Sequence, residues 1–247
     1  MFFNFDATEL YDHFEGVNLG RNASVTWLKR ENASFGRSLP DNSLILDAGS
    51  GSQQYKIFFE HCRYESADFE ALDRPYAKST YVCDLSSIPV EDGRFDAIVL
   101  NQVLEHLPYP NDVLKELFRV LKPGGRMIAT APFFYEEHDQ PYDFFRYTQY
   151  AWRRMMADAG FVIEDLHWME GYLCTVAYQL HRAWRYLPGR PSDIAPGILG
   201  WVAAPLIWAC GPIFRVLAQI FYRIDEQHRY TSKGFPKNYV CIVSKPE

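Results

Sequence analysis

The chain has no excess of positive charge and no cysteine pattern that would indicate a disulfide framework. Its 247 residues include 25 lysines and arginines against 31 aspartates and glutamates, which gives a formal net charge of −6. Proteins that hold nucleic acid mainly through phosphate contacts usually carry a dominant basic face, so we expect no nucleic-acid partner. The five cysteines show no C-x-x-C spacing, and we expect them to be reduced, as in a cytoplasmic protein.

The start of the chain also lacks the pattern of a secretory signal. Residues 1–6 place no basic region before an apolar run, which favours a cytoplasmic location. Internal repeats of 20 to 50 residues are absent as well. With 48% hydrophobic and 23% charged residues, the composition is typical of one globular domain with an elaboration.

The most informative segment that is present is an apolar run, 44–46, followed by an acid and two glycines. Asp47, Gly49 and Gly51 in this order predict a buried strand that enters a ligand-binding turn. A dinucleotide fingerprint would place a third glycine at position 54, where this chain has Gln54. A phosphate loop would end in Gly-Lys-Ser/Thr, which is also missing.

The remaining pattern, Asp-x-Gly-x-Gly after a strand, resembles the first motif of the class I S-adenosylmethionine-dependent methyltransferases, and in particular the type 11 group. Asp68 closes a second strand-like run 21 residues after Asp47, near the ~20-residue interval expected for a ribose-binding acid. The resemblance continues through residues 95–107 and 121–126 and covers roughly residues 40–168. It implies S-adenosyl-L-methionine as the cofactor, bound by Asp47, Gly49, Ser50, Gly51, Asp68, Asp84, Leu85, Asn101 and Gln102.

The resemblance also predicts the fold class and the domain organisation. We expect an α/β, Rossmann-like doubly wound sheet that is mostly parallel, with an antiparallel C-terminal strand and an apolar helical insertion. Residues 1–40 would form a helical lead-in and residues 41–168 the cofactor-binding core. Residues 169–236 would form the insertion, and residues 237–247 the strand that completes the sheet.

The expected chemistry is an in-line displacement of a methyl group onto a small-molecule, sugar or lipid-linked glycan acceptor, on oxygen, as in glycan biosynthesis. The protein must align the reactants, exclude water and remove the proton of a hydroxyl acceptor, and no metal is required. An imidazole titrates near neutrality, so His138 is the first candidate for the base and His106 the second. The candidate substrate-binding residues lie in the aromatic segment 132–147 and are Tyr135, Glu137, Asp143, Arg146 and Tyr147.

The insertion is unusually apolar. Residues 194–214 include no charged side chain, but Pro205 and Pro212 argue against one unbroken membrane helix. We expect a broken helical hairpin that packs over the sheet edge or against the partner in a homodimer. The alternative is peripheral membrane contact through residues 194–214.

Two other function classes stay open. One is a non-catalytic module that keeps the fold and serves as a cofactor-binding or membrane-proximal partner. The other is an NAD-dependent oxidoreductase, which Gln54 and the lack of a Tyr-x-x-x-Lys pair disfavour.

Overall fold

The computed structural model describes residues 23–70 and 77–247. The first 22 residues of the expected lead-in therefore lie outside the described residues. The chain divides into two compact units, one formed by residues 27–169 and 237–247 and the other containing residues 170–236.

The first unit is built on a seven-stranded sheet with the order β3-β2-β1-β4-β5-β7-β6. The first five strands in this order pair in parallel, and β7 is antiparallel to both β5 and β6. This arrangement confirms the predicted fold class. The strands are β1 (Leu44–Ala48), β2 (Arg63–Asp68), β3 (Tyr81–Val82), β4 (Phe95–Asn101), β5 (Leu121–Pro132), β6 (Val162–Trp168) and β7 (Asn238–Ser244).

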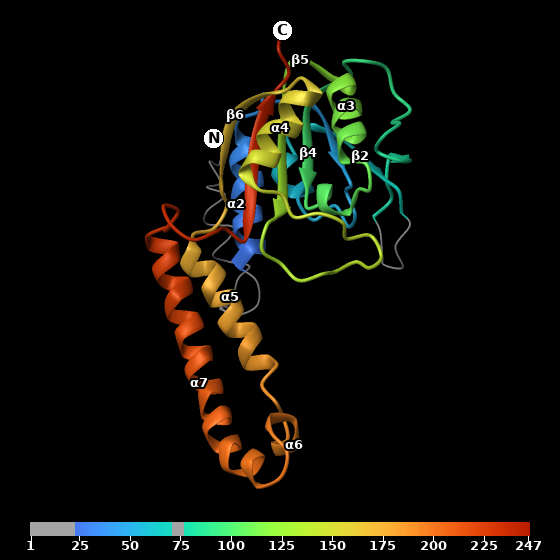
Figure 1. Cartoon of the computed structure of the whole chain (residues 1–247). Helices are drawn as coiled ribbons and strands as arrows, with labels where there is room; N and C mark the ends of the chain where they lie inside the picture. Colours follow the sequence, from blue (N-terminus) through green and yellow to red (C-terminus); the bar gives the residue numbers. More distant parts are fainter. Residues whose placement is uncertain (1–22, 71–76) are drawn as a thin grey trace. The chain divides into compact units, whose positions relative to one another are not determined.

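Both faces of the sheet are apolar and covered, which explains why its central strands are continuous hydrophobic runs. Side chains alternate along β1, so Leu46 joins the core on one face while Ile45 joins the core on the other. Helices α3 (Pro110–Val120) and α4 (Gln149–Ala159) supply the first core, and α2 (Ala23–Arg37) supplies residues of the second (Figure 1).

Helix α4 shows how local sequence sets these elements. Thr148 caps its start by accepting a hydrogen bond from the backbone N–H of Ala151, at 3.3 Å. Gly160 ends it in the left-handed conformation, with φ of +96°. Trp152 and Met156 are buried at one-turn spacing, so the predicted apolar stripe faces the sheet.

The second unit contains α5 (Tyr172–Arg185), the short α6 (Pro191–Ile194) and α7 (Ile198–Gln227). The expectation of a helix broken at its prolines is wrong, because α7 is continuous through Pro205 and Pro212. The two prolines are seven residues apart, close to two helical turns, and both are exposed. Each one removes a single intrahelical hydrogen bond on the outer side, and α5 packs along the other side (Figure 1).

Leu117→Ala tests the core between α3 and the sheet. Leu117 is fully buried, so the substitution should lower the free energy of unfolding by about 2–5 kcal/mol. Urea denaturation measures this change. Lys115→Ala on the exposed side of the same helix is the matched control and should stay within about 0.5 kcal/mol; equal effects at both positions would contradict the assignment of the core.

Candidate active site

A cleft opens at the carboxyl ends of β1 and β4, where the strand order reverses direction. Open α/β sheets bind their ligands at such a switch point. The cleft has a volume of about 330 Å³. Six of the nine residues predicted to hold the cofactor line it, namely Asp47, Gly49, Ser50, Gly51, Asn101 and Gln102, together with Ser52, Gln54, Tyr55, His106, His138 and Asp139.

The turn after β1 requires glycine for two separate reasons. Gly49 has φ of +75°, and a Cβ built on it would lie 2.4 Å from Cγ2 of Val103, which follows β4. Gly51 has φ of +49°, and its backbone N–H donates to Oδ2 of Asp68 at 2.8 Å. The two glycines therefore bring the end of β1 against both neighbouring strand ends.

Asp47 lies at the floor of the cleft and is almost completely buried. Burial raises its pKa to about 6, the hydroxyl of Tyr64 opposes this by donating a hydrogen bond to Oδ2, and the charge of Asp68 adds to the rise. The sequence pattern gives no signal for Tyr64, because only the pairing of β2 with β1 places it there.

The hydroxyl of Ser50 is buried beside the cleft, with no hydrogen-bond partner among the described residues. A buried polar atom without a partner is costly unless a ligand satisfies it. The amino-acid end of S-adenosylmethionine would fit these groups. They are the Ser50 hydroxyl without a partner, the glycine turn and the buried carboxyl of Asp47.

The other three predicted cofactor residues lie outside the cleft lining. Asp68 ends β2 and already accepts hydrogen bonds from the backbone N–H groups of Gly51 and Glu70. Asp84 is exposed, and Leu85 is buried in the core. The ribose role of Asp68 and the cofactor-binding roles of Asp84 and Leu85 stay predictions.

Asn101 and Gln102 are held by a hydrogen-bond network at the end of β4. The amide of Asn101 donates to Oδ1 of Asn32 at 2.7 Å and its oxygen accepts from the hydroxyl of Thr130 at 3.1 Å. Gln102 donates to the same hydroxyl at 3.2 Å. Asn32 lies on α2, 69 residues earlier in the chain, so the sequence pattern offered no signal for it.

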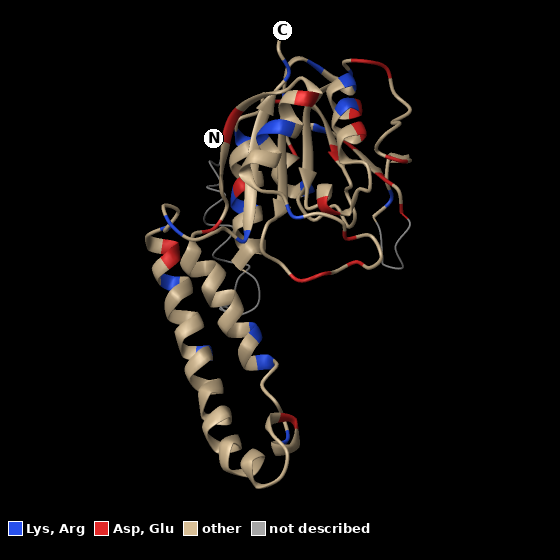
Figure 2. Cartoon of the chain, in the orientation of Figure 1, with Lys and Arg blue, Asp and Glu red and all other residues tan. Residues whose placement is uncertain are grey.

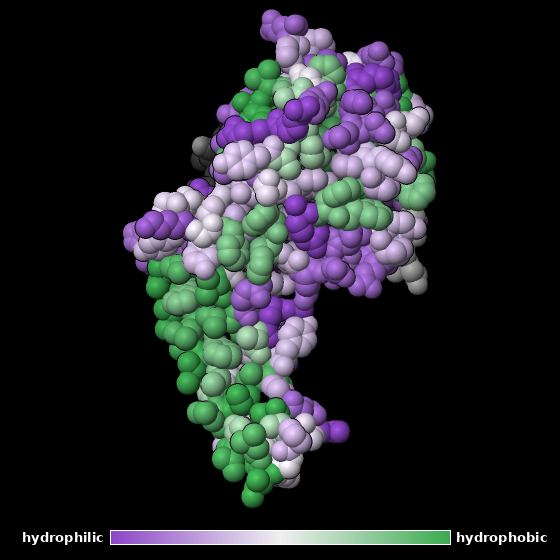
Figure 3. Space-filling model, in the orientation of Figure 1, coloured by the Kyte–Doolittle hydropathy of each residue, from purple (hydrophilic) through white to green (hydrophobic). Residues whose placement is uncertain are grey.

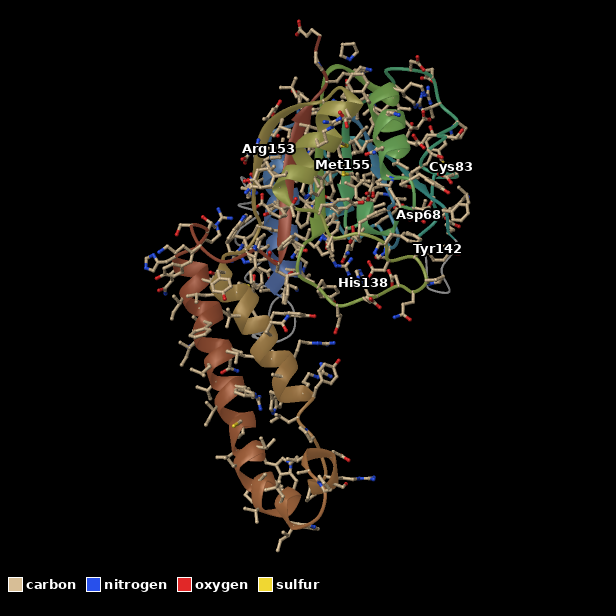
Figure 4. The ribbon with its side chains drawn as sticks, in the orientation of Figure 1. Asp68, Cys83, His138, Tyr142, Arg153 and Met155 are labelled. Atoms are coloured by element: carbon tan, nitrogen blue, oxygen red, sulfur yellow. The ribbon has the colours of Figure 1, made fainter. Side chains whose placement is uncertain are left out.

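The second side of the cleft is formed by the 3-10 turn η2 (Leu104–His106) and the loop of residues 133–147. The rings of His106 and His138 meet edge to face with centroids 4.7 Å apart. Nδ1 of His106 hydrogen-bonds to the backbone carbonyl of Tyr142, so this nitrogen carries the proton and Nε2 is the basic atom. Asp68, His138 and Tyr142 lie at the same end of the sheet (Figure 4).

Glu105 lies beneath the two histidines and is completely buried. Neither of its carboxyl oxygens has a hydrogen-bond partner among the described residues, and Oε1 is 3.7 Å from Nε2 of His106. Burial raises the pKa of Glu105 to about 8 and lowers the pKa of His106. Ligand atoms of Glu105, His106 and His138 lie within 4.8 Å of one another, so this group has the composition of a divalent-cation site as well as that of a proton acceptor.

The residues predicted to bind substrate separate into two groups. Tyr135 packs edge to face on His138, with centroids 4.9 Å apart, and Glu137 is exposed on the loop. Asp143 and Arg146 instead form a bidentate ion pair. The two guanidinium N–H groups of Arg146 donate to Oδ1 and Oδ2 of Asp143 at 2.6 and 2.8 Å, which lowers the pKa of Asp143. The ring of Tyr147 is buried in the core. Its hydroxyl donates a hydrogen bond to the backbone carbonyl of Leu104 at 2.8 Å.

Residues 46–129 match the family model of a methyltransferase domain. This segment of the core is therefore similar to a methyltransferase domain. The match confirms, for this segment, the resemblance to methyltransferases that the sequence motifs predict. The matched residues contain β1, β2, β3 and β4 and most of β5, which include the floor and one wall of the cleft.

Two curated relatives share this segment. A tRNA (carboxymethyluridine(34)-5-O)-methyltransferase of Arabidopsis thaliana is 33% identical over 108 residues, covering 40% of this chain and 26% of that protein. An arsenite methyltransferase of Aquipseudomonas alcaligenes is 32% identical over 83 residues, covering 34% of this chain and 24% of that protein. The match therefore spans about a quarter of each relative's length.

The solved structure of geranyl diphosphate C-methyltransferase from Streptomyces coelicolor A3(2), in complex with Mg²⁺, geranyl diphosphate and S-adenosyl-L-homocysteine, has the same fold. It superposes with a TM-score of 0.53 at 16% identity, covering 90% of this chain and 81% of that one.

The raised pKa of Asp47 predicts a pH-dependent stability. In the folded protein the carboxyl keeps its proton up to about pH 6, whereas the unfolded chain loses it near pH 3.8. The contribution of Asp47 to the free energy of unfolding is therefore fully present below pH 3.8 and is lost as the pH rises through 6. The total loss is up to about 3 kcal/mol. Asp47→Asn should gain stability relative to the wild type over this interval, as measured by urea denaturation from pH 4.5 to 7.5.

Tyr64→Phe supplies the control for this titration. Removing the hydroxyl that lowers the pKa of Asp47 should move the pH-dependent interval upward. A stability difference between wild type and Asp47→Asn that is the same at every pH would show that Asp47 has an ordinary pKa.

Proposed function

We propose that the protein is an S-adenosylmethionine-dependent methyltransferase that methylates an oxygen of a small-molecule, sugar or lipid-linked glycan acceptor. The observation that carries this proposal is one cleft that both the glycine turn and the two histidines line. One wall has the chemistry for a methyl donor and the other has groups that accept a proton. The named relatives act on tRNA and on arsenite, so they support methyl transfer and leave the acceptor to the local chemistry of this site.

On the donor side, the buried carboxyl of Asp47 suits the ammonium group of the cofactor, and the hydroxyl of Ser50 suits its carboxylate. The bound cofactor supplies an activated methyl group on a sulfonium. The chain must then hold the acceptor in line and keep water out. The apolar side chains beneath the turn, among them Val103, provide the rigid backing for this alignment.

On the acceptor side, His106 is neutral at physiological pH because burial lowers its pKa, so Nε2 is ready to receive the proton of an acceptor hydroxyl. His138 presents a second imidazole beside it. Tyr135 and the exposed rings of Phe134, Tyr142, Phe144 and Phe145 give the loop aromatic faces. Such faces stack on sugar rings, which is why we favour a glycan-type acceptor over arsenite-like ions.

Cofactor binding tests the donor side. Gly49→Ala should weaken S-adenosylhomocysteine binding at least 10-fold in calorimetry, because the added Cβ would enter the side chain of Val103 at 2.4 Å. Gly93→Ala is the matched control: Gly93 also has a positive φ, but its Cβ would meet nothing closer than 3.8 Å. Binding of NAD in place of S-adenosylhomocysteine by the folded wild type would refute the proposal.

The histidines test the acceptor side. His106→Asn and His138→Asn should each reduce methyl transfer from labelled cofactor into saccharide and polar-lipid fractions, by about 10²-fold or more for the residue that acts as base. Cofactor affinity should change little. His228→Asn, at an exposed histidine in the other unit, should leave transfer intact. Full transfer by both active-site variants would exclude a histidine base.

A further inference from the structure

Helix α7 presents a long apolar surface to solvent. We define the outer face of α7 by its exposed large hydrophobic residues: Ile198, Leu199, Trp201, Val202, Leu206, Trp208, Ile213, Val216 and Ile220. Ile198 is 82% exposed and Leu206 is 72% exposed. Figure 3 shows hydrophobic side chains gathered over this helix. Soluble proteins rarely expose a contiguous patch of this kind unless something binds it.

The opposite side of α7 packs against α5 and the segment before α7. The helix is therefore held in place, and its exposed side is an outer surface. Small residues approach the neighbouring segments closely: a Cβ on Gly211 would lie 3.1 Å from the ring of Trp184, and one on Gly200 would lie 2.3 Å from the carbonyl of Pro191. Ala218 and Tyr222 are buried in a cluster with residues of α5. Only 17% of the most apolar 18-residue window of α7 is buried, whereas a core helix would be mostly buried.

The charges around this surface are mostly positive. Residues 198–214 contain none, and between residues 172 and 224 the chain has five arginines, no lysine and a single acid, Asp193. This local excess of positive charge contrasts with the net charge of −6 for the whole chain. Figure 2 shows α7 almost free of charged residues along most of its length. The arginines are Arg182, Arg185, Arg190, Arg215 and Arg223.

We propose that the outer face of α7 docks into the interfacial region of a lipid bilayer with anionic head groups. Apolar side chains enter the boundary between head groups and acyl chains, and the arginines contact phosphates. Trp201 and Trp208 are the side chains that favour this depth, because an indole has an apolar body and a polar edge.

The geometry favours a helix lying in the interface over one that crosses the bilayer. The charge-free part of α7, residues 198–214, is about 26 Å long at ~1.5 Å per residue, shorter than the ~30 Å hydrocarbon core. Helix α5, which would be the second helix of a spanning hairpin, has only 14 residues. Its last turn contains Arg182 and Arg185. A spanning hairpin would have to carry these arginines into the hydrocarbon.

A second copy of the chain is a poorer partner for the same surface. A two-fold interface would bring the arginines of one copy near those of the other, and Asp193 is the one acid between residues 172 and 224 that could offset them. Anionic lipid head groups supply negative charge to the arginines, and they can move within the bilayer to reach each one. A membrane surface therefore satisfies both the apolar face and its basic border.

Vesicle co-sedimentation of the full chain tests the proposal. The protein should bind vesicles of phosphatidylglycerol and phosphatidylcholine more tightly than vesicles of phosphatidylcholine alone. The double variant Trp201→Glu with Leu206→Glu should lose at least 10-fold in affinity, because both side chains are exposed and charge there opposes insertion. Tyr150→Glu, at an exposed aromatic residue of α4, is the matched control and should bind like the wild type.

Two further readouts make the outcome decisive. Tryptophan emission should shift to shorter wavelength with vesicles and be quenched by brominated acyl chains, and both effects should weaken in Trp201→Phe. Light scattering reports the oligomeric state. Absence of vesicle binding by folded wild type, or a dimer that the double variant dissociates without any vesicle binding, would overturn the proposal. Calorimetry with S-adenosylhomocysteine on the same variants keeps this result separate from the proposed methyl transfer.

Discussion

The close contact between Gly49 and Val103 sets the geometry on which the cleft depends. The end of β1 and the turn after β4 can approach only because position 49 has no side chain. This approach places the glycine turn and the histidine pair in the lining of one cleft. Parallel strands open their carboxyl ends at a switch point in any case, and the missing side chain at position 49 lets these two strand ends lie closer together than a larger residue would allow. In the proposed methyl transfer, the donor and acceptor atoms must meet in line within this cleft.

The acceptor wall is held by main-chain contacts to η2. The carbonyl of Glu105 accepts from the backbone N–H of Phe144 at 2.8 Å, and His106 contacts the carbonyl of Tyr142. The hydroxyl of Tyr147 reaches the carbonyl of Leu104. Three successive residues of one turn thus hold a loop that lies some 40 residues further along the chain. The loop is fixed at its far end, so its exposed aromatic rings are presented from a defined position.

Local signals predicted much of this molecule. The apolar stripe from Trp152 to Ala159, with Thr148 before it and Gly160 after it, predicts α4 because capping and periodicity act within a few residues. The acid and glycines after β1 predict the cofactor turn for the same reason. Tyr64, Asn32 and the contact from His106 to Tyr142 were missed because they depend on which strands and loops become neighbours. The continuity of α7 was missed because packing against α5 outweighs the local cost of its prolines.

The burial of Glu105 gives the acceptor wall a coupled protonation behaviour. With its pKa raised to about 8, this carboxyl is mostly protonated at neutral pH, and His106 beside it is neutral. A proton arriving on His106 would place a positive charge 3.7 Å from Oε1 of Glu105, which favours ionisation of the carboxyl. The two groups therefore titrate as a pair, and a charge on one is stabilised by the opposite charge on the other. In its neutral, protonated form a buried glutamate without a hydrogen-bond partner is compatible with a folded protein, because no isolated charge is then buried beside the loop.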